Sequence, residues 1–534
     1  MHTECYPISI LPRLSRLFFD YAESRQPLTP FYLASPYVQQ WTAPSLDPAI
    51  RARIADLLEA QNRAFNASPA TLANIDRLRH GAPAIVTGQQ VTLFGGPLFT
   101  LFKAATAIRK AKDTGAVPIF WLATEDHDLD EADHVTFPAR HELQTLRLAH
   151  EPSHRPVGAI PLGLGIRPLL DQAAELLGPV PIFEALEAAY TPDATFAQAF
   201  ARVLAKIFAD QGLILIDAAS CDFHALGAPV LRHAIEHAAE LESALLDRSK
   251  LLEARGYHAQ VLVTPSSSLL FLLDEESGSR LALKRKNGNH APTGESEYWV
   301  AGKKSWSTAD LLAILDSAPE RLSPNALLRP VFQDYILPTT AYIGGPAEIA
   351  YFAQSQVLYD AILGRTTPVI PRLSATLVEP AVAAVLARHE VQLDDLLHSN
   401  PDQLAQRLGA RAIPIEGKRR LASAGNALDE ELTSLTQWMR QLSPDLGHSA
   451  DVSASKMRYQ MNRLRRLAAN YQLQTEASLR RHVDALYLNL FPEQHPQERI
   501  IGAAAFLARY GDFLIPQLIE HAAQECPGHK AIFL

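Results

Sequence analysis

Two short apolar runs, and the polar residues that end them, dominate the pattern of the first 140 residues. The run at 84–86 gives way to Thr87-Gly88-Gln89-Gln90, and the run at 117–123 ends in Thr124-Glu125-Asp126-His127-Asp128. Between them lie a glycine–proline turn at 95–97 and a helical pattern that extends to about residue 112. A strand, a helix and a strand predict a βαβ unit with parallel strands. Both polar segments would then lie at the carboxyl ends of neighbouring strands, where open α/β sheets bind their ligands.

Strand-like and helix-like patterns continue to alternate as far as about residue 375. Apolar runs that predict further buried strands occur at 213–217, 339–343 and 367–370. Helical patterns occupy most of 1–80, 167–189, 194–210 and 347–362. Residues 258–306 instead show short apolar runs separated by turns, which predict a small antiparallel insertion. We therefore expect an α/β core over residues 1–375, built on a parallel sheet with inserted connecting segments.

The pattern changes after residue 375, where helical periodicity takes over for residues 376–534. A spacing typical of a coiled-coil seam links Leu428, Leu432, Leu435, Met439 and Leu442. A second seam, in a helix expected at about 452–488, links Met457, Met461, Leu464, Ala468 and Tyr471. Two such helices joined near Ser443-Pro444 predict an antiparallel hairpin. Each seam is short, so the pattern fits a dimerisation arm and an amphipathic pair packed on its own domain equally well.

Length, charge and cysteine content narrow the class of protein. A chain of 534 residues is long enough for about two to four domains. Its net charge of −9 argues against general nucleic-acid binding. The chain has no basic, apolar leader at its N-terminus and no apolar stretch long enough to span a membrane. Cys5, Cys221 and Cys526 form no CxxC motif and suggest no disulfide framework, which favours the cytoplasm.

The segment Glu125-Asp126-His127-Asp128 is the candidate catalytic group. A histidine beside carboxylates forms a general acid/base pair, because the carboxylate orients the ring and raises its basicity. The alternative is a solvated acidic loop that caps the next helix. The position directly after a buried parallel strand favours catalysis. A metal site built on these residues and His134 is the weaker interpretation, because the chain has no HExxH motif and no cysteine pair.

Two further groups of residues are predicted to bind substrate. The first surrounds the first strand end and the turn that follows, where glycines allow close backbone approach and a helix begins: Thr87, Gln89, Gln90, Gly95, Gly96 and Lys103. It matches neither common nucleotide-binding glycine motif. The second group surrounds a similar Gly-Gly-Pro turn and includes arginines suited to a carboxylate: Arg329, Gln333, Asp334, Gly345, Glu348, Tyr351 and Arg372.

Four stretches of the chain resemble one known family, the BshC cysteine ligases of bacillithiol biosynthesis. They read TGQQVTLFGGPLFTLFKAAT, VPIFWLATEDHDLDEADHV, RPVFQDYILPTTAYIGGPAEIAYFAQ and NLFPEQHPQERIIGAAAFLARYG. They occur in the expected order between about residues 80 and 512. The first three are long and specific, whereas the last is weaker by itself.

The resemblance implies a cytoplasmic ligase that joins cysteine to glucosaminyl-malate, giving the small thiol bacillithiol. It also implies a Rossmann-like core and a C-terminal coiled-coil domain that forms a homodimer. The family is similar to ligases that activate a carboxylate as an adenylate, so ATP or another nucleotide is the expected cofactor. The chain lacks the HIGH-like and KMSKS-like tetrapeptides of that class. Small molecules are the expected partners, without nucleic acid or membrane.

Amide-bond formation needs an activated carboxyl, a base that deprotonates the sugar ammonium, and donors for the developing oxyanion. We predict that His127, oriented by Asp126 or Asp128, is this base. The other predicted roles are acyl or phosphate binding by Gln89, Gln90 and nearby amides, and malate binding by Arg329 and Arg372.

Two other functions fit the same sequence. The first is a metal-dependent amidase or deacetylase that acts on a related amino sugar through Glu125, His127, Asp128 and His134. The second is a non-catalytic assembly protein in which the coiled coil is the active part.

Overall fold

A five-stranded parallel sheet lies at the centre of the computed structural model, which describes residues 2–38, 41–151, 153–287, 297–475, 477–523, 526 and 528–534. The strand order is β13–β12–β2–β3–β6, and every neighbouring pair is parallel. The strands are β2 (Ala84–Gln90), β3 (Val117–Ala123), β6 (Ile214–Asp217), β12 (Thr339–Gly344) and β13 (Val369–Pro371). The helix α4 (Phe99–Thr114) connects β2 to β3. The predicted βαβ unit and the parallel α/β core are therefore confirmed.

Strand β2 is longer than its apolar run. It pairs with β3 over its whole length, from Ala84 opposite Val117 to Gln90 opposite Ala123, so backbone hydrogen bonds carry the strand through its polar residues. Side chains alternate between the two faces along a strand. Thr87 therefore lies within the sheet, where its hydroxyl donates to the Ile343 carbonyl oxygen at 2.9 Å.

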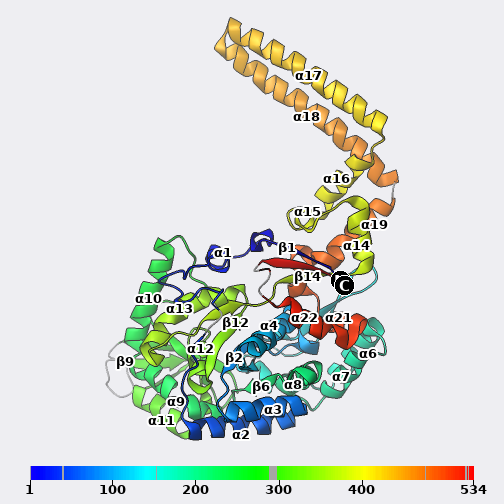
Figure 1. Ribbon diagram of the computed structural model, residues 1–534. Coiled ribbons are helices and arrows are strands. Elements are labelled where there is room, and N and C mark those ends of the chain that lie inside the picture. The colour runs from blue at the N-terminus through cyan, green and yellow to red at the C-terminus, as the bar shows by residue number, and fades with distance from the viewer. Residues whose placement is uncertain are drawn as a thin grey trace.

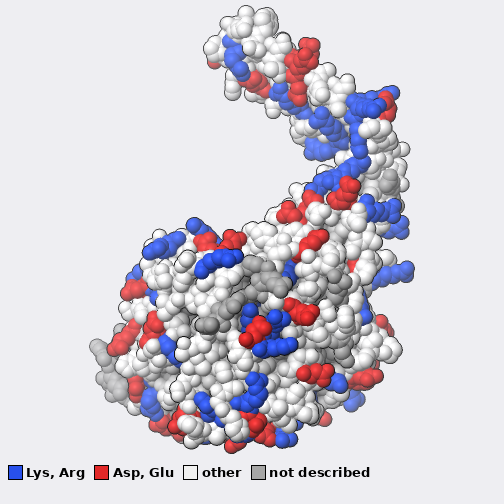
Figure 2. All heavy atoms as spheres, in the orientation of Figure 1, with Lys and Arg blue, Asp and Glu red and all other residues white. Residues whose placement is uncertain are grey.

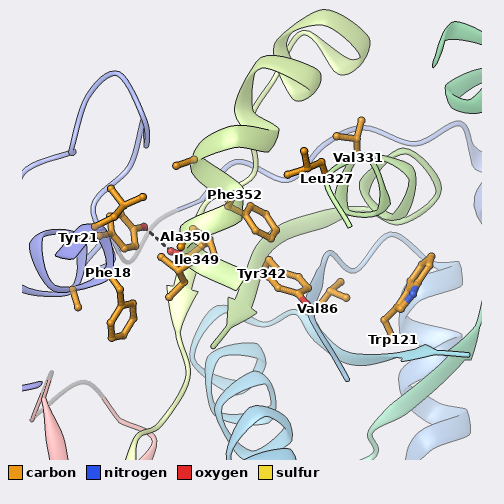
Figure 3. Packing of buried hydrophobic residues seen from close by; sticks show 14 of the residues in the cluster. Phe18, Tyr21, Val86, Trp121, Leu327, Val331, Tyr342, Ile349, Ala350 and Phe352 are labelled. Atoms are coloured by element: carbon orange, nitrogen blue, oxygen red, sulfur yellow. Dashed lines mark hydrogen bonds between the residues drawn. The ribbon is translucent and has the colours of Figure 1, made fainter. Parts of the chain in front are cut away.

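Apolar residues cover both faces of this sheet. On β3, Ile119 and Trp121 join one buried cluster, whereas Phe120 and Leu122 join the cluster on the opposite face. Figure 3 shows the first cluster around Tyr342 of β12, whose ring stacks on Phe352 at a centroid distance of 5.0 Å. This continuous burial is typical of a parallel sheet with helices on both sides.

Helices surround the sheet (Figure 1). Those of the N-terminal part are α1 (Arg16–Glu23), α2 (Pro48–Ala64), α3 (Pro69–Arg79), α5 (Leu129–Ala132), α6 (Ile166–Leu177), α7 (Pro181–Ala189), α8 (Phe196–Ile207), α9 (Cys221–Glu236), α10 (Ala238–Ala254), α11 (Thr308–Ser317), α12 (Arg329–Ile336) and α13 (Pro346–Leu363). The single helix expected over 167–189 is two helices, α6 and α7, because Gly178 adopts a positive φ of 78° and Pro181 starts a new helix.

Two smaller antiparallel sheets lie beside the core. One has the order β10–β9–β8–β7–β11 and consists of β7 (Ser267–Leu273), β8 (Arg280–Asn287), β9 (Glu297–Ala301), β10 (Lys304–Trp306) and β11 (Leu322–Pro324). Residues 288–296 of the insertion expected at 258–306 lie outside the described residues. The other sheet is a hairpin of β4 (His134–Pro138) and β5 (Leu143–Arg147).

The two ends of the chain meet in a three-stranded sheet. Here β1 (His2–Tyr6) pairs with β15 (His529–Phe533), which also pairs with β14 (Ala375–Val378). Cys5 and Cys526 form a disulfide beside this sheet, so the expectation of no disulfide framework is wrong. Sequence spacing did not indicate the pair, because its members are 521 residues apart and only strand pairing brings them together. Cys221 is free and exposed.

The C-terminal part is helical. Its helices are α14 (Pro380–His389), α15 (Leu393–Leu397), α16 (Pro401–Ala412), α17 (Ile415–Leu442), α18 (Pro444–Thr475), α19 (Ala477–Leu490), α20 (Gln497–Ile500), α21 (Ala503–Tyr510) and α22 (Leu514–His521). The helix expected at 452–488 is divided between α18 and α19, and residue 476 lies outside the described residues. Among the residues described, no helix combines the length and apolar character needed to cross a membrane.

Helices α17 and α18 form the predicted antiparallel hairpin, which extends from the body as a long arm (Figure 1). The base of the arm packs on its own domain, because Gly409 of α16 lies against Ala469 and Leu473 of α18. The rest of the hairpin extends away from the body (Figure 1). Leu432, Ala454 and Met461 are buried between the two helices. About half of each predicted seam is exposed in the single chain, including Leu435, Leu442, Met457, Leu464 and Tyr471.

Candidate active site

A cavity of about 670 Å³ opens at the carboxyl ends of β2, β3 and β12. Its size is ordinary for a small-molecule site, and its position is the one that the βαβ pattern predicted. The predicted residues that line it are Gln89, Gln90, Lys103, Glu125, Asp126, His127, Arg329, Gly345, Glu348, Tyr351 and Arg372. The structure thus brings most of three sequence-distant groups to one place.

A buried ion pair between Lys103 of α4 and Glu348 of α13 lies at the centre of the cavity wall. The Lys103 ammonium also donates to the Gly88 carbonyl oxygen at 2.7 Å and to Gln89 Oε1 at 2.9 Å. Glu348 accepts from the Tyr342 hydroxyl at 2.6 Å and from the Gly345 amide at 2.8 Å. Burial favours the neutral acid, but the Lys103 charge and these hydrogen bonds hold the pKa of Glu348 below its ordinary value.

Gly345 allows these charged groups to converge. A Cβ atom at this position would lie 3.3 Å from Glu348 Oε2, 3.6 Å from Arg372 Nε and 3.9 Å from Lys103 Cε. A larger residue would therefore press on the carboxylate and fill the space beside the arginine. The Gly344-Gly345-Pro346 turn therefore contributes to the site because Gly345 has no side chain.

Arg329 of α12 is held in place by three neutral oxygens. It donates to Gln333 Oε1 at 3.0 Å, to the Tyr351 hydroxyl at 3.0 Å and to the Tyr342 hydroxyl at 3.4 Å. None of these three partners is a carboxylate, although the nearby charge of Glu348 favours the guanidinium. Arg329 is therefore able to bind an anion in the cavity.

A second cationic region lies beside the loop that follows β13. Arg372 is buried and forms a double hydrogen bond with Glu498 of α20. Arg499, the next residue of α20, also lines the cavity. Burial and the nearby Arg372 lower the pKa of Arg499. The C-terminal part of the chain therefore contributes directly to the wall of this cavity.

The side of the cavity at the end of β3 carries the carboxylates of Glu125 and Asp126 together with the guanidinium of Arg280. The Glu125 carboxylate accepts from His224 Nε2 at 2.7 Å, and His224 is fully buried on α9. Burial alone would lower the pKa of His224, but the Glu125 carboxylate raises it above its ordinary value. The hydrogen bond to this buried ring fixes Glu125 in position.

His127 is half-buried in the cavity wall, and its Nδ1 atom has no hydrogen-bond partner among the described residues. Burial and the nearby Arg280 guanidinium lower the pKa of His127. The ring is therefore neutral near pH 7 and able to accept a proton. Arg280 itself stacks on Phe271, 3.9 Å from the ring centroid, so the antiparallel sheet supplies this charge.

The predicted orientation of His127 by a carboxylate is not observed. Asp126 Oδ1 lies 3.9 Å from His127 Nδ1 and instead accepts the backbone N–H groups of His127 and Asp128, at 2.7 and 3.2 Å. Aspartate satisfies local backbone donors in this way at many turns. Asp128 is exposed and does not line the cavity. Its carbonyl oxygen accepts from the Gln90 side chain at 2.8 Å, which ties this loop to β2.

Several other predicted binding residues do not reach the cavity. They are Thr87, Gly95, Gly96, Gln333 and Asp334. Gly96 packs so closely on Thr92 that a Cβ would lie 2.2 Å from the hydroxyl, so this turn is structural. Gln333 and Asp334 are buried behind Arg329, where they support it through a chain of hydrogen bonds that ends at the Tyr359 hydroxyl. Their contribution to the site is indirect.

The metal-ligand set considered from sequence does not assemble. Within the described ranges, the only group with metal-binding geometry is Asp130, Asp133 and His150, which lies outside the cavity lining. Asp133 there accepts from Arg147 at 2.6 and 2.7 Å, so a cation already compensates its charge. His134 contacts Asp133 and does not join Glu125 and His127.

Sequence reasoning missed four residues that line the cavity or hold a residue that does: His224, Arg280, Glu498 and Arg499. His224 lies within α9, seven residues after the last residue of β6, so no strand-end signal marked it in the sequence. Glu498 and Arg499 belong to the fourth family-like stretch, which received no role. For Arg280 the sequence offers no signal, because only the docking of the antiparallel sheet brings it close to His127.

Comparison with known proteins gives full-length matches. One family model, described as the N-terminal Rossmann-like domain of bacillithiol biosynthesis BshC, matches residues 1–373, and the C-terminal coiled-coil domain of BshC matches residues 375–534. Proteins named "Putative cysteine ligase BshC" are similar to the chain. They include those of Koribacter versatilis (40% identity, 100% of both chains), Solibacter usitatus (36%, 100% of both) and Symbiobacterium thermophilum (33%, 91% of this chain and 90% of the relative).

Proposed function

The chain belongs to the BshC family of bacillithiol biosynthesis, and from this premise we propose that it forms an amide bond between cysteine and glucosaminyl-malate. The observation that carries the proposal is the cavity at the sheet edge, with cationic groups on one side and an acidic group with a neutral histidine on the other. This distribution suits an acceptor that carries both carboxylates and an amine.

His127 is the proposed base. The amine of the sugar must lose a proton before it attacks the acyl carbon of cysteine, and a neutral imidazole in the cavity wall is suited to accept it. Glu125 and Asp126 lie on the same side and supply negative charge that attracts the ammonium group before the transfer. Burial and the Arg280 guanidinium both disfavour a positive charge on His127 and lower its pKa.

The proposed acyl-binding side is formed by Gln89, Gln90 and Lys103. Lys103 is already engaged by Gln89 and Glu348, so it acts mainly as a fixed positive charge beside the developing oxyanion. The amides of the Gly95-Gly96 turn do not take part, because that turn lies away from the cavity. Arg329 and Arg372 are proposed to bind the two malate carboxylates.

Activation of the cysteine carboxylate is proposed to depend on ATP or another nucleotide. A free carboxylate is a poor electrophile, so a leaving group must be attached before the amine attacks. The cationic side of the cavity offers the charge that a phosphate would need.

One experiment tests the function and the cofactor together. Purified protein is incubated with cysteine, glucosaminyl-malate and each nucleotide in turn, and the product is followed by mass.

The expected result is a product with the mass of the two substrates minus water, formed with one nucleotide and absent without any. Product formed equally well without nucleotide would overturn the cofactor proposal. A failure to form product with every nucleotide, using folded protein that binds both substrates, would overturn the ligase proposal.

We also propose that the arm forms a homodimer. Large apolar side chains are exposed along it, including Trp438 at 54% and Leu442 at 59%. Figure 2 shows a largely uncharged surface at the end of the arm farthest from the body. Large apolar side chains exposed one helical turn apart, as Trp438 and Leu442 are on α17, are typical of a protein interface.

Replacing Trp438 and Leu442 together by glutamate is expected to convert a dimer into a monomer, because two charges would be buried at the interface. Light scattering measures the mass directly. Leu164→Glu, at an apolar residue that is 70% exposed on the body, is the matched control and should leave the mass unchanged. Wild-type protein with the mass of one chain would contradict the proposal.

The cytoplasm is the proposed compartment of this biosynthetic enzyme. The cysteines do not support this location, because Cys5 and Cys526 form a disulfide and stable disulfides are rare in reducing compartments.

A further inference from the structure

The helix α20 connects the C-terminal helical part to the cavity through three consecutive side chains. Gln497 fixes the helix against β14, because its side chain accepts from the Leu377 amide and donates to the Leu377 carbonyl oxygen, both at 2.8 Å. Two hydrogen bonds to a single residue define the register between the helix and the strand. They place the next two residues, Glu498 and Arg499, beside the loop that follows β13.

Glu498 orients Arg372. Its carboxylate accepts from Arg372 Nη1 at 3.0 Å and from Nη2 at 2.6 Å, and both side chains are only 4% exposed. Arg372 Nη1 also donates to the Leu373 carbonyl oxygen at 2.7 Å. The terminal nitrogens are thus occupied, whereas the buried Nε has no partner among the described residues. Nε lies on the Gly345 side, where a Cβ atom would be 3.6 Å away, and both residues line the cavity.

Arg499 adds a second guanidinium to the same wall. No hydrogen bond or ion pair holds its side chain within the described ranges, although it lines the cavity. Its charged neighbours include Arg372, whose like charge is unfavourable for it, and the carboxylates of Glu498, Glu131 and Glu348, which partly compensate that charge. An anion between the two arginines would remove this repulsion and satisfy the unpartnered Arg372 N–H.

We propose that Arg372 Nε and Arg499 form an anion subsite for a carboxylate of the malate group, with Arg499 as a substrate-binding residue and Glu498 as a positioning residue. The inference rests on the proposed acceptor, glucosaminyl-malate. It means that the C-terminal domain, besides its arm, completes the substrate cavity. Arg499 is exposed and its side chain forms no ion pair with the described residues, so its removal breaks no buried pair.

The test measures equilibrium binding by calorimetry, which needs no catalytic turnover. Glucosaminyl-malate, free malate and inorganic phosphate are each titrated into wild-type protein and into Arg499→Met. Loss of one charged hydrogen bond predicts that the variant binds both malate compounds about tenfold to hundredfold more weakly. Arg419→Met, at an exposed arginine of the arm in the same domain, is the matched control and should bind as wild type.

Equal malate binding by wild type and Arg499→Met would overturn the subsite. Weakened phosphate binding with unchanged malate binding would also overturn it, and would assign the arginines to a phosphate. Wild-type protein that binds neither malate compound would overturn the proposed acceptor itself. Product formation with normal malate binding by the variant would retain the ligase function and reject only the subsite.

The positioning role of Glu498 is tested by a kinetic measurement that would not change if the residue served only to keep the protein folded. Glu498→Gln keeps the shape of the side chain but loses its charge, so Arg372 is expected to shift and the KM for glucosaminyl-malate to rise about tenfold with little change in kcat. Glu498→Asp should recover part of this loss. An equal change in the KM for cysteine would contradict the positioning role, and if Glu498→Gln does not fold, Arg499→Met still decides the proposal.

Discussion

Replacing His127 by alanine is expected to lower the kcat of amide formation by about 10²–10⁴-fold while the protein remains folded. His127 lines the cavity, and its Nδ1 atom makes no hydrogen bond within the described residues, so its removal breaks no internal contact of the ring nitrogen. Product formation by mass measures the rate. His141→Ala, at an exposed histidine outside the cavity, is the control. A His127→Ala variant that retains the wild-type rate would show that another group is the base.

The pH dependence of the rate provides a second check on His127. Only the neutral imidazole accepts a proton, so the rate falls as the pH drops through the pKa of His127. Burial and Arg280 lower that pKa from its ordinary value of 6.5. The acidic limb of the pH–rate profile is therefore expected below pH 6.5. In His127→Ala this limb should disappear.

Replacing Lys103 by methionine is expected to lower the free energy of unfolding by about 3–5 kcal/mol. Glu348 would remain buried without its cation, although Tyr342 and Gly345 would still donate to it. Chemical denaturation of wild-type and variant protein measures the difference. The double variant Lys103→Met, Glu348→Gln should regain part of the loss, because it removes the unpaired charge as well.

An exposed ion pair is the matched control for Lys103. Lys250 pairs with Asp247, and their side chains are 74% and 70% exposed. Lys250→Met should change the free energy of unfolding by about 1 kcal/mol or less. A Lys103→Met effect as small as this would mean that the buried pair does not hold α4 and α13 together.

The parts of the site that sequence predicted correctly are those that follow directly from a strand. Gln89 and Gln90 end β2, and Glu125 and His127 follow β3, so the parallel pairing of the two strands places them together. The errors have a local cause. The Thr87 side chain lies within the sheet, where its hydroxyl donates to the Ile343 carbonyl oxygen. The Asp126 carboxylate accepts a hydrogen bond from the backbone of its own turn and is not available to orient His127.

The hydrophobic pattern by itself determined the βαβ unit, the cavity at the carboxyl edge of its sheet and the helical hairpin, because the first two depend on segments that are neighbours in sequence and the hairpin depends on a short repeat. The pairing of β2 with β12 joins segments distant in sequence, so only the tertiary structure decided the strand order. Only the tertiary structure decided the partners of the charged groups. Glu125 with His224, Arg372 with Glu498, and Lys103 with Glu348 are pairs distant in sequence. Pairs of this kind leave no periodic trace in the sequence, since any carboxylate can pair with any cation that folding brings within reach.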